Sequence, residues 1–164
     1  MSDEKKQIKL LIVDDEKKLL NIMSERFGLK DFDVSTASDG KQAIKAAKKG
    51  KFDVAILDMK MQGMDGMEVL KILKKKHKFL EIIILTGFAS IESAVEAGKL
   101  GAFGYLEKPY NFESLVQKLK EAYETRLQKK FKHDKERLDR LKMLSMGDPL
   151  YALRSLMSID DDVK

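Results

Sequence analysis

The 164-residue chain is long enough for one ordinary domain with a buried core and an appendage, and it has no cysteine. Disulfide scaffolds, thiolate zinc sites and thiol nucleophiles are therefore excluded. No apolar run approaches the roughly 18 residues of a membrane helix, and the chain opens with polar residues instead of a signal-peptide core, so we expect a cytoplasmic protein. The net charge of +5 resides in the segment from Arg126 to Lys142, with eight basic and three acidic residues.

Five short apolar stretches alternate with segments of helical periodicity along the chain. The stretches cover residues 8–13, 32–37, 52–57, 80–85 and 104–106. The first, third and fourth are nearly continuous runs of Ile, Val and Leu, which is typical of strands buried on both faces of a parallel sheet. Strands that alternate with helices imply right-handed crossovers, so the pattern predicts an α/β fold with a doubly wound parallel sheet.

The helical segments carry recognisable start and stop residues. The first has apolar residues at helical spacing (Leu19, Leu20, Met23 and Phe27), and Gly28 after them predicts a left-handed cap. Asp65 followed by Glu68 predicts a capping box at the start of another helix. Ser90 and Asn111 are suited to cap the last two helices.

The last predicted helix has no stop before residues 147–149 and would be about 52 Å long if it continued from Phe112 to Met146. The compact domain needs only its first turns, so we place the domain at 1–122 and a helical extension at 123–164. Apolar residues recur in the extension at spacings of four, seven and three (Leu127, Phe131, Leu138 and Leu141), although Asp134 and Ser145 interrupt the seam. A loop at 147–149 and a short amphipathic segment at 150–159 follow. We interpret the extension as a dimerisation or partner-binding segment.

Polar side chains stand where the predicted strands end. Asp14 and Asp15 follow the first strand, Asp58 the third, Thr86 the fourth and Lys108 the fifth. In an open parallel sheet these ends border the functional crevice. Three neighbouring carboxylates repel one another unless a cation lies among them, and Mg²⁺ prefers such open acidic sites with retained water and phosphate oxygens. A lysine and a hydroxyl can contact phosphoryl oxygens, so the arrangement indicates phosphoryl transfer.

The residues around Asp58 make this interpretation specific. The string Leu57-Asp58-Met59-Lys60-Met61-Gln62-Gly63-Met64-Asp65-Gly66 resembles the phosphoacceptor region of response-regulator receiver domains. Asp14-Asp15, Thr86 and Tyr105-Leu106-Glu107-Lys108-Pro109 match the family's other motifs in order and approximate spacing, and the resemblance covers about residues 7–122. Gln62 departs from the family, which commonly has proline there. The resemblance implies a flavodoxin-like strand order 2-1-3-4-5 in a two-component phosphorelay protein.

The resemblance also implies a role for each matched residue. Asp58 would attack a phosphohistidine of a sensor histidine kinase, and Asp15 and Asp58 would bind Mg²⁺ directly, positioned by Asp14. The remaining implied roles are a backbone carbonyl ligand from Lys60, phosphoryl contacts from Lys108 and Thr86, and a switch in which Tyr105 changes rotamer when Thr86 moves. Such a protein catalyses only its own phosphorylation and autodephosphorylation, and is not otherwise an enzyme.

Several alternatives compete with these assignments. Asp14 and Asp15 could simply cap a helix, and Tyr105 could be a half-buried aromatic residue. His77 and His133 lie in lysine-rich stretches without a partner motif, so we assign them no role. A phosphatase of similar fold would need an acid-base aspartate at the position of Lys60.

Two outputs remain open for the phosphorylated domain. The favoured one is binding of a downstream protein, together with a homodimer formed through the C-terminal helix. The alternative is a DNA-binding transcriptional regulator that uses the basic helix, but about 40 residues after the domain are too few for a typical winged output domain. Nucleic acid is therefore the less favoured partner, and no membrane partner is expected.

Overall fold

The computed structural model describes residues 6–145, 147, 150, 153–154 and 157. In this part of the chain, parallel strands form a five-stranded sheet in the order β2-β1-β3-β4-β5, which confirms the predicted topology. The strands are β1 (Ile8–Val13), β2 (Phe32–Ala37), β3 (Val54–Leu57), β4 (Glu81–Thr86) and β5 (Gly104–Glu107). The helices are α1 (Lys17–Gly28), α2 (Gly40–Lys49), α3 (Gly66–Lys76), α4 (Ile91–Lys99) and α5 (Phe112–Ser145).

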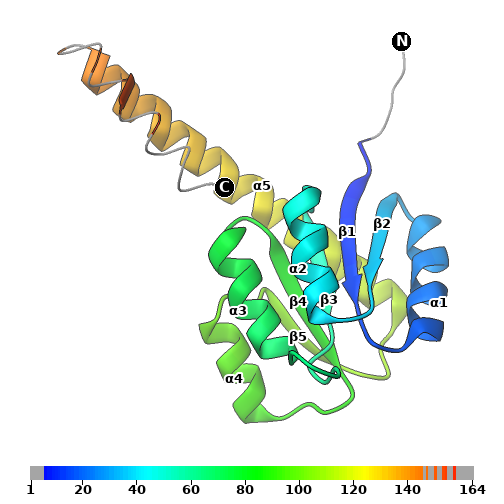
Figure 1. Ribbon diagram of the computed structural model, residues 1–164. Helices are drawn as coiled ribbons and strands as arrows, with labels where there is room; N and C mark the ends of the chain where they lie inside the picture. Colours follow the sequence, from blue (N-terminus) through cyan, green and yellow to red (C-terminus); the bar gives the residue numbers. More distant parts are fainter. Residues whose placement is uncertain (1–5, 146, 148–149, 151–152, 155–156, 158–164) are drawn as a thin grey trace.

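Helices cover both faces of the sheet (Figure 1). Alternate residues of β1 enter different cores: Leu10 and Ile12 pack with α1 and α5, whereas Leu11 and Val13 pack with α2, α3 and α4. The central strands β3 and β4 are buried on both faces in the same way. The continuous apolar runs in the sequence therefore reflect strands with no solvent-facing side.

Three predicted helix caps are present. Side-chain oxygens of Asp65, Ser90 and Asn111 accept hydrogen bonds from main-chain N–H groups three residues later, at 3.0, 3.1 and 2.9 Å. Asp39 caps α2 in the same way through the N–H of Gln42, which the sequence analysis did not identify. Each cap gives a partner to an N–H group that the first helical turn leaves without one.

The predicted left-handed cap at Gly28 is wrong. Gly28 is the last residue of α1, and the capping residue Leu29 has a right-handed φ of −83°. The chain reverses instead at Asp31, whose φ is +66°, and the Asp31 carbonyl accepts a hydrogen bond from the N–H of Ile8 at 3.1 Å. An aspartate tolerates this conformation better than most residues, so the turn does not require the glycine.

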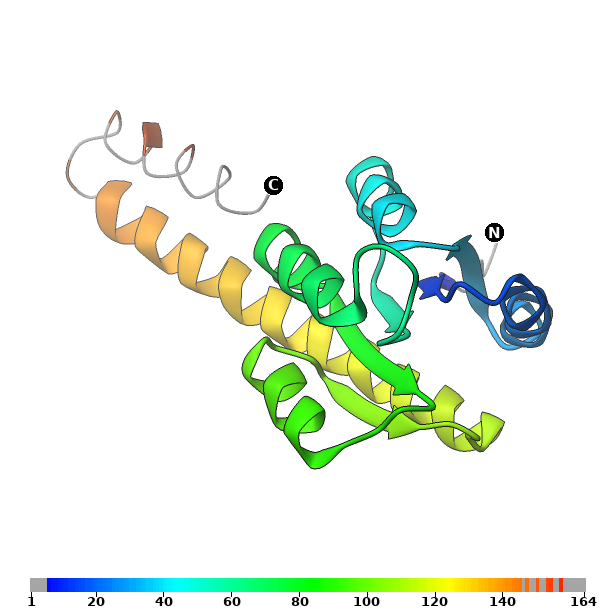
Figure 2. The same ribbon diagram turned by 60° about the horizontal axis from the view of Figure 1, so that its bottom comes forward.

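Helix α5 continues as one element of 34 residues, about 51 Å long. Its first turns bury Leu115, Leu119 and Ala122 against the sheet, and the later turns project away from it (Figures 1 and 2). Leu127, Phe131 and Leu138 of the predicted seam are exposed, and the coiled coil stays a prediction. The loop at 147–149 and the segment 150–159 lie largely outside the described residues. Among the described residues, no helix is long and apolar enough to cross a membrane.

Candidate functional site

The carboxyl-terminal edge of the sheet gathers the polar residues that follow the strands. Asp14 comes directly after β1 and Asp58 directly after β3, and both carboxylates are buried, whereas Asp15 is exposed. Lys108 follows β5, and its main-chain N–H donates to the carbonyl of Thr86, the last residue of β4, at 2.8 Å. The parallel sheet therefore brings together residues that are 94 positions apart.

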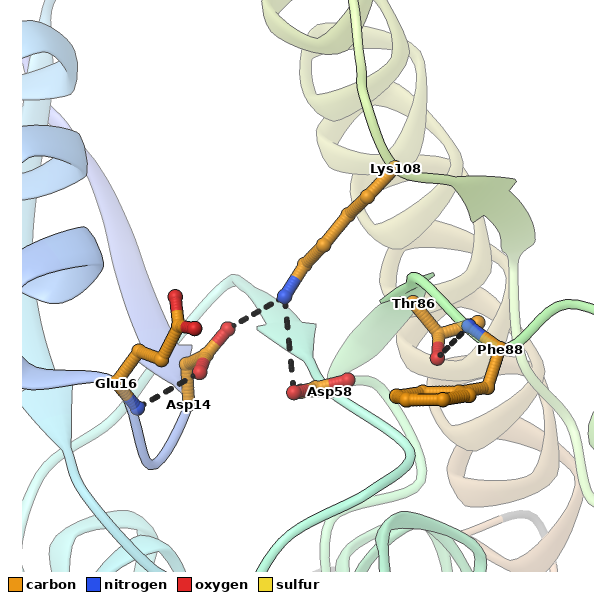
Figure 3. Close-up of polar contacts among 6 residues, drawn as sticks. All are labelled: Asp14, Glu16, Asp58, Thr86, Phe88 and Lys108. Carbon is orange, nitrogen blue, oxygen red and sulfur yellow. Dashed lines mark hydrogen bonds and ion pairs between the residues drawn. The ribbon is translucent and has the colours of Figure 1, made fainter.

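We call Asp14, Asp15, Asp58 and Lys108 the carboxyl-edge cluster. Carboxylate oxygens of its three aspartates lie within 4.8 Å of one another. The Lys108 amine donates to Asp14 Oδ2 at 2.8 Å and lies 3.6 Å from Asp58 Oδ2 (Figure 3). The other oxygen of Asp14 accepts the N–H of Glu16 at 2.9 Å, which fixes the Asp14 carboxylate toward the lysine. One amine thus contacts two of the three clustered carboxylates, and a net negative charge remains.

The surroundings of Asp58 and Lys108 shift their pKa values. Burial raises the pKa of Asp58, and the neighbouring Asp14 raises it further, although Lys108 and the main-chain N–H groups of Lys60 and Met59 act in the opposite direction. Burial lowers the pKa of Lys108, but its hydrogen bond to Asp14 and the charges of Asp14, Asp58 and Glu16 together outweigh burial and raise it. The lysine is therefore held protonated beside a carboxylate that ionises reluctantly.

A glycine keeps the loop after Asp58 close to the start of α3. A Cβ atom built on Gly66 would lie 2.3 Å from the carbonyl oxygen of Asp58 and 2.6 Å from Met59 Cα. The N–H of Gly66 donates to the Met59 carbonyl at 2.8 Å, which ties the loop across its base. Any larger residue would push this loop, and with it Asp58, out of position.

The hydroxyl groups of Thr86 and Tyr105 both bind the segment before and at the start of α4. Thr86 Oγ1 is fully buried and accepts a hydrogen bond from the N–H of Phe88 at 3.1 Å (Figure 3). The half-buried Tyr105 accepts the N–H of Ser90 at 3.3 Å and shares a hydrogen bond with the Ser93 hydroxyl. The sequence analysis had identified Ser90 only as a cap and had missed Ser93 entirely. A link from the end of β4 to the tyrosine through this loop is therefore present in the structure.

A cavity of about 650 Å³ opens beside Asp15 and the loop after Asp58. Its lining includes Met59, Lys60 and Met67 on one side and Phe88 and Ser93 on the other. The Lys60 amine lies 4.1 Å from the centre of the Phe88 ring, a cation–π distance. The carboxyl-edge cluster thus meets this cavity through Asp15, and the Lys60–Phe88 pair lines the same cavity.

The residues at this edge fit a hard divalent cation. Two of the three carboxylates are buried, the pKa of Asp58 is raised by burial and by Asp14, and a single lysine balances them. A cation such as Mg²⁺ would remove that repulsion, and the exposed Asp15 leaves room for the water ligands that Mg²⁺ retains. The donor set and the charge of the cluster therefore fit Mg²⁺.

Comparisons with known proteins agree with this geometry. Residues 10–120 match the family model described as the response regulator receiver domain. An NtrX-like response regulator of Rickettsia felis is 38% identical over 120 residues, which are 72% of this chain and 25% of that protein. The transcriptional regulatory protein ZraR of Escherichia coli K12 is 35% identical over 115 residues, 70% of this chain and 26% of that protein. The chain thus spans about a quarter of the length of the curated relatives it matches.

A solved structure makes the same connection. The response regulator protein TrrA of Thermotoga maritima, in complex with Mg²⁺ and BeF, aligns with a TM-score of 0.65 and 32% identity, covering 71% of this chain and 99% of that one. The fold and the comparisons thus define a receiver-type signalling domain of the flavodoxin-like class. The chain belongs to the response regulator receiver domain family, and it contains the receiver domain of a two-component response regulator.

Proposed function

We propose that Asp58 accepts a phosphoryl group from the phosphohistidine of a sensor histidine kinase. The observation that carries this proposal is the carboxyl-edge cluster, in which Asp58 lies between two further carboxylates and the Lys108 amine. One oxygen of Asp58 is near the lysine, and the cavity beside Asp15 gives an incoming donor access to the cluster. Such a site works by positioning and by neutralising charge, as phosphoryl transfer requires.

The proposed ligands for Mg²⁺ are Asp15, Asp58 and the backbone carbonyl of Lys60, with Asp14 positioning them. When bound, Mg²⁺ neutralises the negative charge that builds up around the transferred group. Asp14 is already engaged by Lys108 and by the N–H of Glu16, which suits a positioning role better than direct coordination. Asp15 is exposed and free to turn toward the cation.

The proposed output is a change in the face formed by α4, β5 and α5. Movement of Thr86 toward a phosphoryl group would pull on the Phe88 N–H, and the same loop leads to Ser90 and Ser93, which hold the Tyr105 hydroxyl. A downstream protein would recognise the altered face. The domain would process only its own phosphoryl group, in a cytoplasmic setting, and would not act as an enzyme on other substrates.

The second candidate is a DNA-binding transcriptional regulator. The relative ZraR is a transcriptional regulatory protein, and the segment from Arg126 to Lys142 of the helical extension is basic. Of the eight basic residues between Arg126 and Lys142, two, Arg126 and Lys129, are however already paired with carboxylates of the domain. Gel-shift binding that disappears when the remaining basic residues are neutralised would support this candidate, whereas binding of a protein partner with no DNA shift would support the first.

The decisive experiment for the first proposal is Asp58→Asn. An amide is neither a nucleophile nor a comparable Mg²⁺ ligand, so incorporation of labelled phosphate from acetyl phosphate or a phosphorylated kinase should be abolished. Asp65→Asn is the matched control, because it removes one exposed carboxylate from the same loop while an asparagine still caps α3. Unchanged labelling of Asp58→Asn would contradict the proposal.

A further inference from the structure

A second set of buried charges lies at the opposite, amino-terminal edge of the sheet. Asp53 directly precedes β3, and Glu81 is the first residue of β4. Glu81 is only 1% exposed, although acidic residues are rarely buried unless they are paired. These two carboxylates take no part in the site around Asp58, so the burial of Glu81 and the partial burial of Asp53 require a separate explanation.

Three residues of α5 supply it. Arg126 Nε lies 3.0 Å from Asp53 Oδ1, and Lys129 Nζ lies 2.8 Å from Glu81 Oε1. One turn further on, the His133 ring packs edge-on against Phe79 of the α3–β4 loop, with centroids 5.3 Å apart. Spacings of three and four residues place these three side chains on one face of the helix. The helical extension is therefore bound to three different parts of the domain over two turns.

Further hydrogen bonds connect the partners of α5 to the main chain of the domain. The second oxygen of Asp53 accepts the main-chain N–H of Lys9 at 2.9 Å, so the aspartate joins β1 to the helix. Lys74 donates to the carbonyls of Lys78 and Leu80 at 2.8 and 2.9 Å, which closes the loop that carries Phe79. The side chains of Arg126 and Asp53 are 13% and 20% exposed. In the second pair, the Glu81 side chain is 1% exposed and the Lys129 side chain is 52% exposed, so the Arg126–Asp53 pair is the one with both partners shielded from solvent.

We infer that the amino-terminal edge of β3 and β4 is a docking surface that holds residues 123–133 of α5 in one orientation, so that the helical extension moves with these two strands. We name Asp53, Glu81, Lys74, Arg126 and Lys129 the amino-edge cluster. Because Leu127, Phe131 and Leu138 lie on an exposed face of the same helix, the cluster also decides in which direction that apolar face points. A protein that binds this apolar face would therefore approach the domain in an orientation determined by the packing of α5 on the sheet.

The same two strands carry the switch residues at their other ends. β3 leads from Asp53 to Asp58, and β4 leads from Glu81 to Thr86, five residues in each case. A buried strand is stiff along its length, since both its neighbours and both its faces are packed. On the basis of the proposed function, a displacement of β3 or β4 on phosphorylation would therefore be passed to the extension through the two ion pairs.

The docking surface can be tested without any phosphorylation. The chain has no cysteine, so Lys71→Cys on α3 and Lys135→Cys on the extension, both at exposed positions, accept a pair of spin labels. The unmodified helix should give a narrow label-to-label distance distribution. The Arg126→Gln/Lys129→Gln variant should broaden it and speed amide exchange of residues 126–133 at least tenfold.

The control is Lys130→Gln/Lys132→Gln, which removes the same charge from exposed positions of the same helix and should change neither measurement. Arg126→Lys/Lys129→Arg keeps both charges and should retain most of the narrow distribution. If the double glutamine variant does not fold, the two single variants replace it, and each should broaden the distribution. Wild-type distances and exchange in the glutamine variants would overturn the inference.

Coupling to the switch is measured separately, with Mg²⁺ and beryllofluoride as the phosphoryl mimic. The distance distribution of the wild type should shift when the adduct forms, and the double glutamine variant should form the adduct without that shift. An equal shift in both, or an adduct without a shift in the wild type, would overturn the coupling. Failure of the adduct to form would contradict the function proposed for Asp58 and leave the metal-free result standing.

Discussion

The carboxyl edge and the amino edge of the sheet differ in how their charged side chains are paired. At the carboxyl edge, the amine of Lys108 contacts two of three clustered carboxylates, and negative charge is left over. At the amino edge, two carboxylates face three cations, and Glu81 and Asp53 each have an ion-pair partner on α5. The same strands connect both clusters. The proposed ligand chemistry therefore lies at the edge where carboxylates outnumber cations, and structural attachment lies at the edge where each carboxylate has an ion-pair partner.

The difference also separates two uses of a buried lysine. Lys108 is held protonated because the carboxylates around it raise its pKa. The pKa of Lys74 is lowered instead, by burial and by the cations Lys129 and Arg126, although Glu81 acts in the other direction. A lysine that contacts a phosphoryl group has to stay charged, whereas one that closes a loop through main-chain carbonyls needs only its N–H donors.

The largest effect is expected from Lys108→Ala. Asp58 should still accept a phosphoryl group, but the response of the Thr86–Tyr105 connection should be lost, because Lys108 is the charged contact between the end of β5 and the cluster. Amide exchange from residue 90 to 110, with and without phosphorylation, is the measurement. Lys41→Ala, at an exposed position, is the control. A full phosphorylation-dependent change in the Lys108 variant would refute the coupling role.

The next largest effect is expected on Mg²⁺ affinity, and it tests whether the cation binds only at the carboxyl-edge cluster. Asp15→Ala should weaken binding more than tenfold, or about 1.4 kcal/mol, and Asp14→Ala less, a ranking that comes from the family resemblance. Asp53→Asn at the amino edge should leave affinity unchanged, since its carboxylate is already matched. Isothermal titration calorimetry compares the three, and equal losses at Asp14 and Asp15 would remove the ranking.

The lifetime of the phosphorylated state tests whether Lys60 and Phe88, which line the cavity beside the cluster, slow the attack of water on the phosphoryl group. Lys60 and Phe88 form a cation–π pair there, and neither can orient an attacking water as an amide or carboxylate could. We expect a comparatively stable phospho-aspartate, and the Lys60→Asn/Phe88→Glu variant should lose it about tenfold faster, or about 1.4 kcal/mol of barrier. Decay is followed with Mg²⁺ and without kinase. A wild-type half-life of seconds, or no acceleration, would contradict the expectation.

The smallest expected effect is on the free energy of unfolding, and its sign should differ between the two edges of the sheet. Without Mg²⁺ at neutral pH, Asp58→Asn should raise the free energy of unfolding, since it removes a repelled charge. Asp53→Asn should lower it by about 1 kcal/mol by weakening the bond to Arg126. Urea unfolding compares both variants with the wild type. The same sign for both would break the contrast between matched and unmatched charge.

The pH dependence of that first effect follows from the raised pKa of Asp58. The native state binds this proton more tightly than the unfolded chain, so wild-type stability falls as pH rises from the ordinary value of 3.8 through the raised pKa of the native state. The Asp58→Asn variant has no carboxyl group at this position, so its stability does not fall in this way. Its advantage over the wild type should therefore be full above the raised pKa and should disappear toward pH 3.

The sequence alone determined the order of the elements and the residues at the carboxyl edge. Both depend on local patterns: continuous apolar runs mark buried strands, and a polar residue directly after such a run must lie at the sheet edge. Caps at Asp65, Ser90 and Asn111 are equally local, because each binds an N–H group three residues away. The predicted left-handed cap at Gly28 was wrong because the chain reverses its direction at a later residue, Asp31.

Only the tertiary structure decided how distant residues pair. Nothing in the chain around Arg126 or Lys129 indicates that their partners are Asp53, 73 positions away, and Glu81, 48 positions away. The sequence analysis assigns no role to His133, although its ring packs against Phe79. A charge pattern on a helix shows which side chains are available, but the rotation of that helix against the sheet determines which of them become buried and paired, and rotation is a property of the packed molecule.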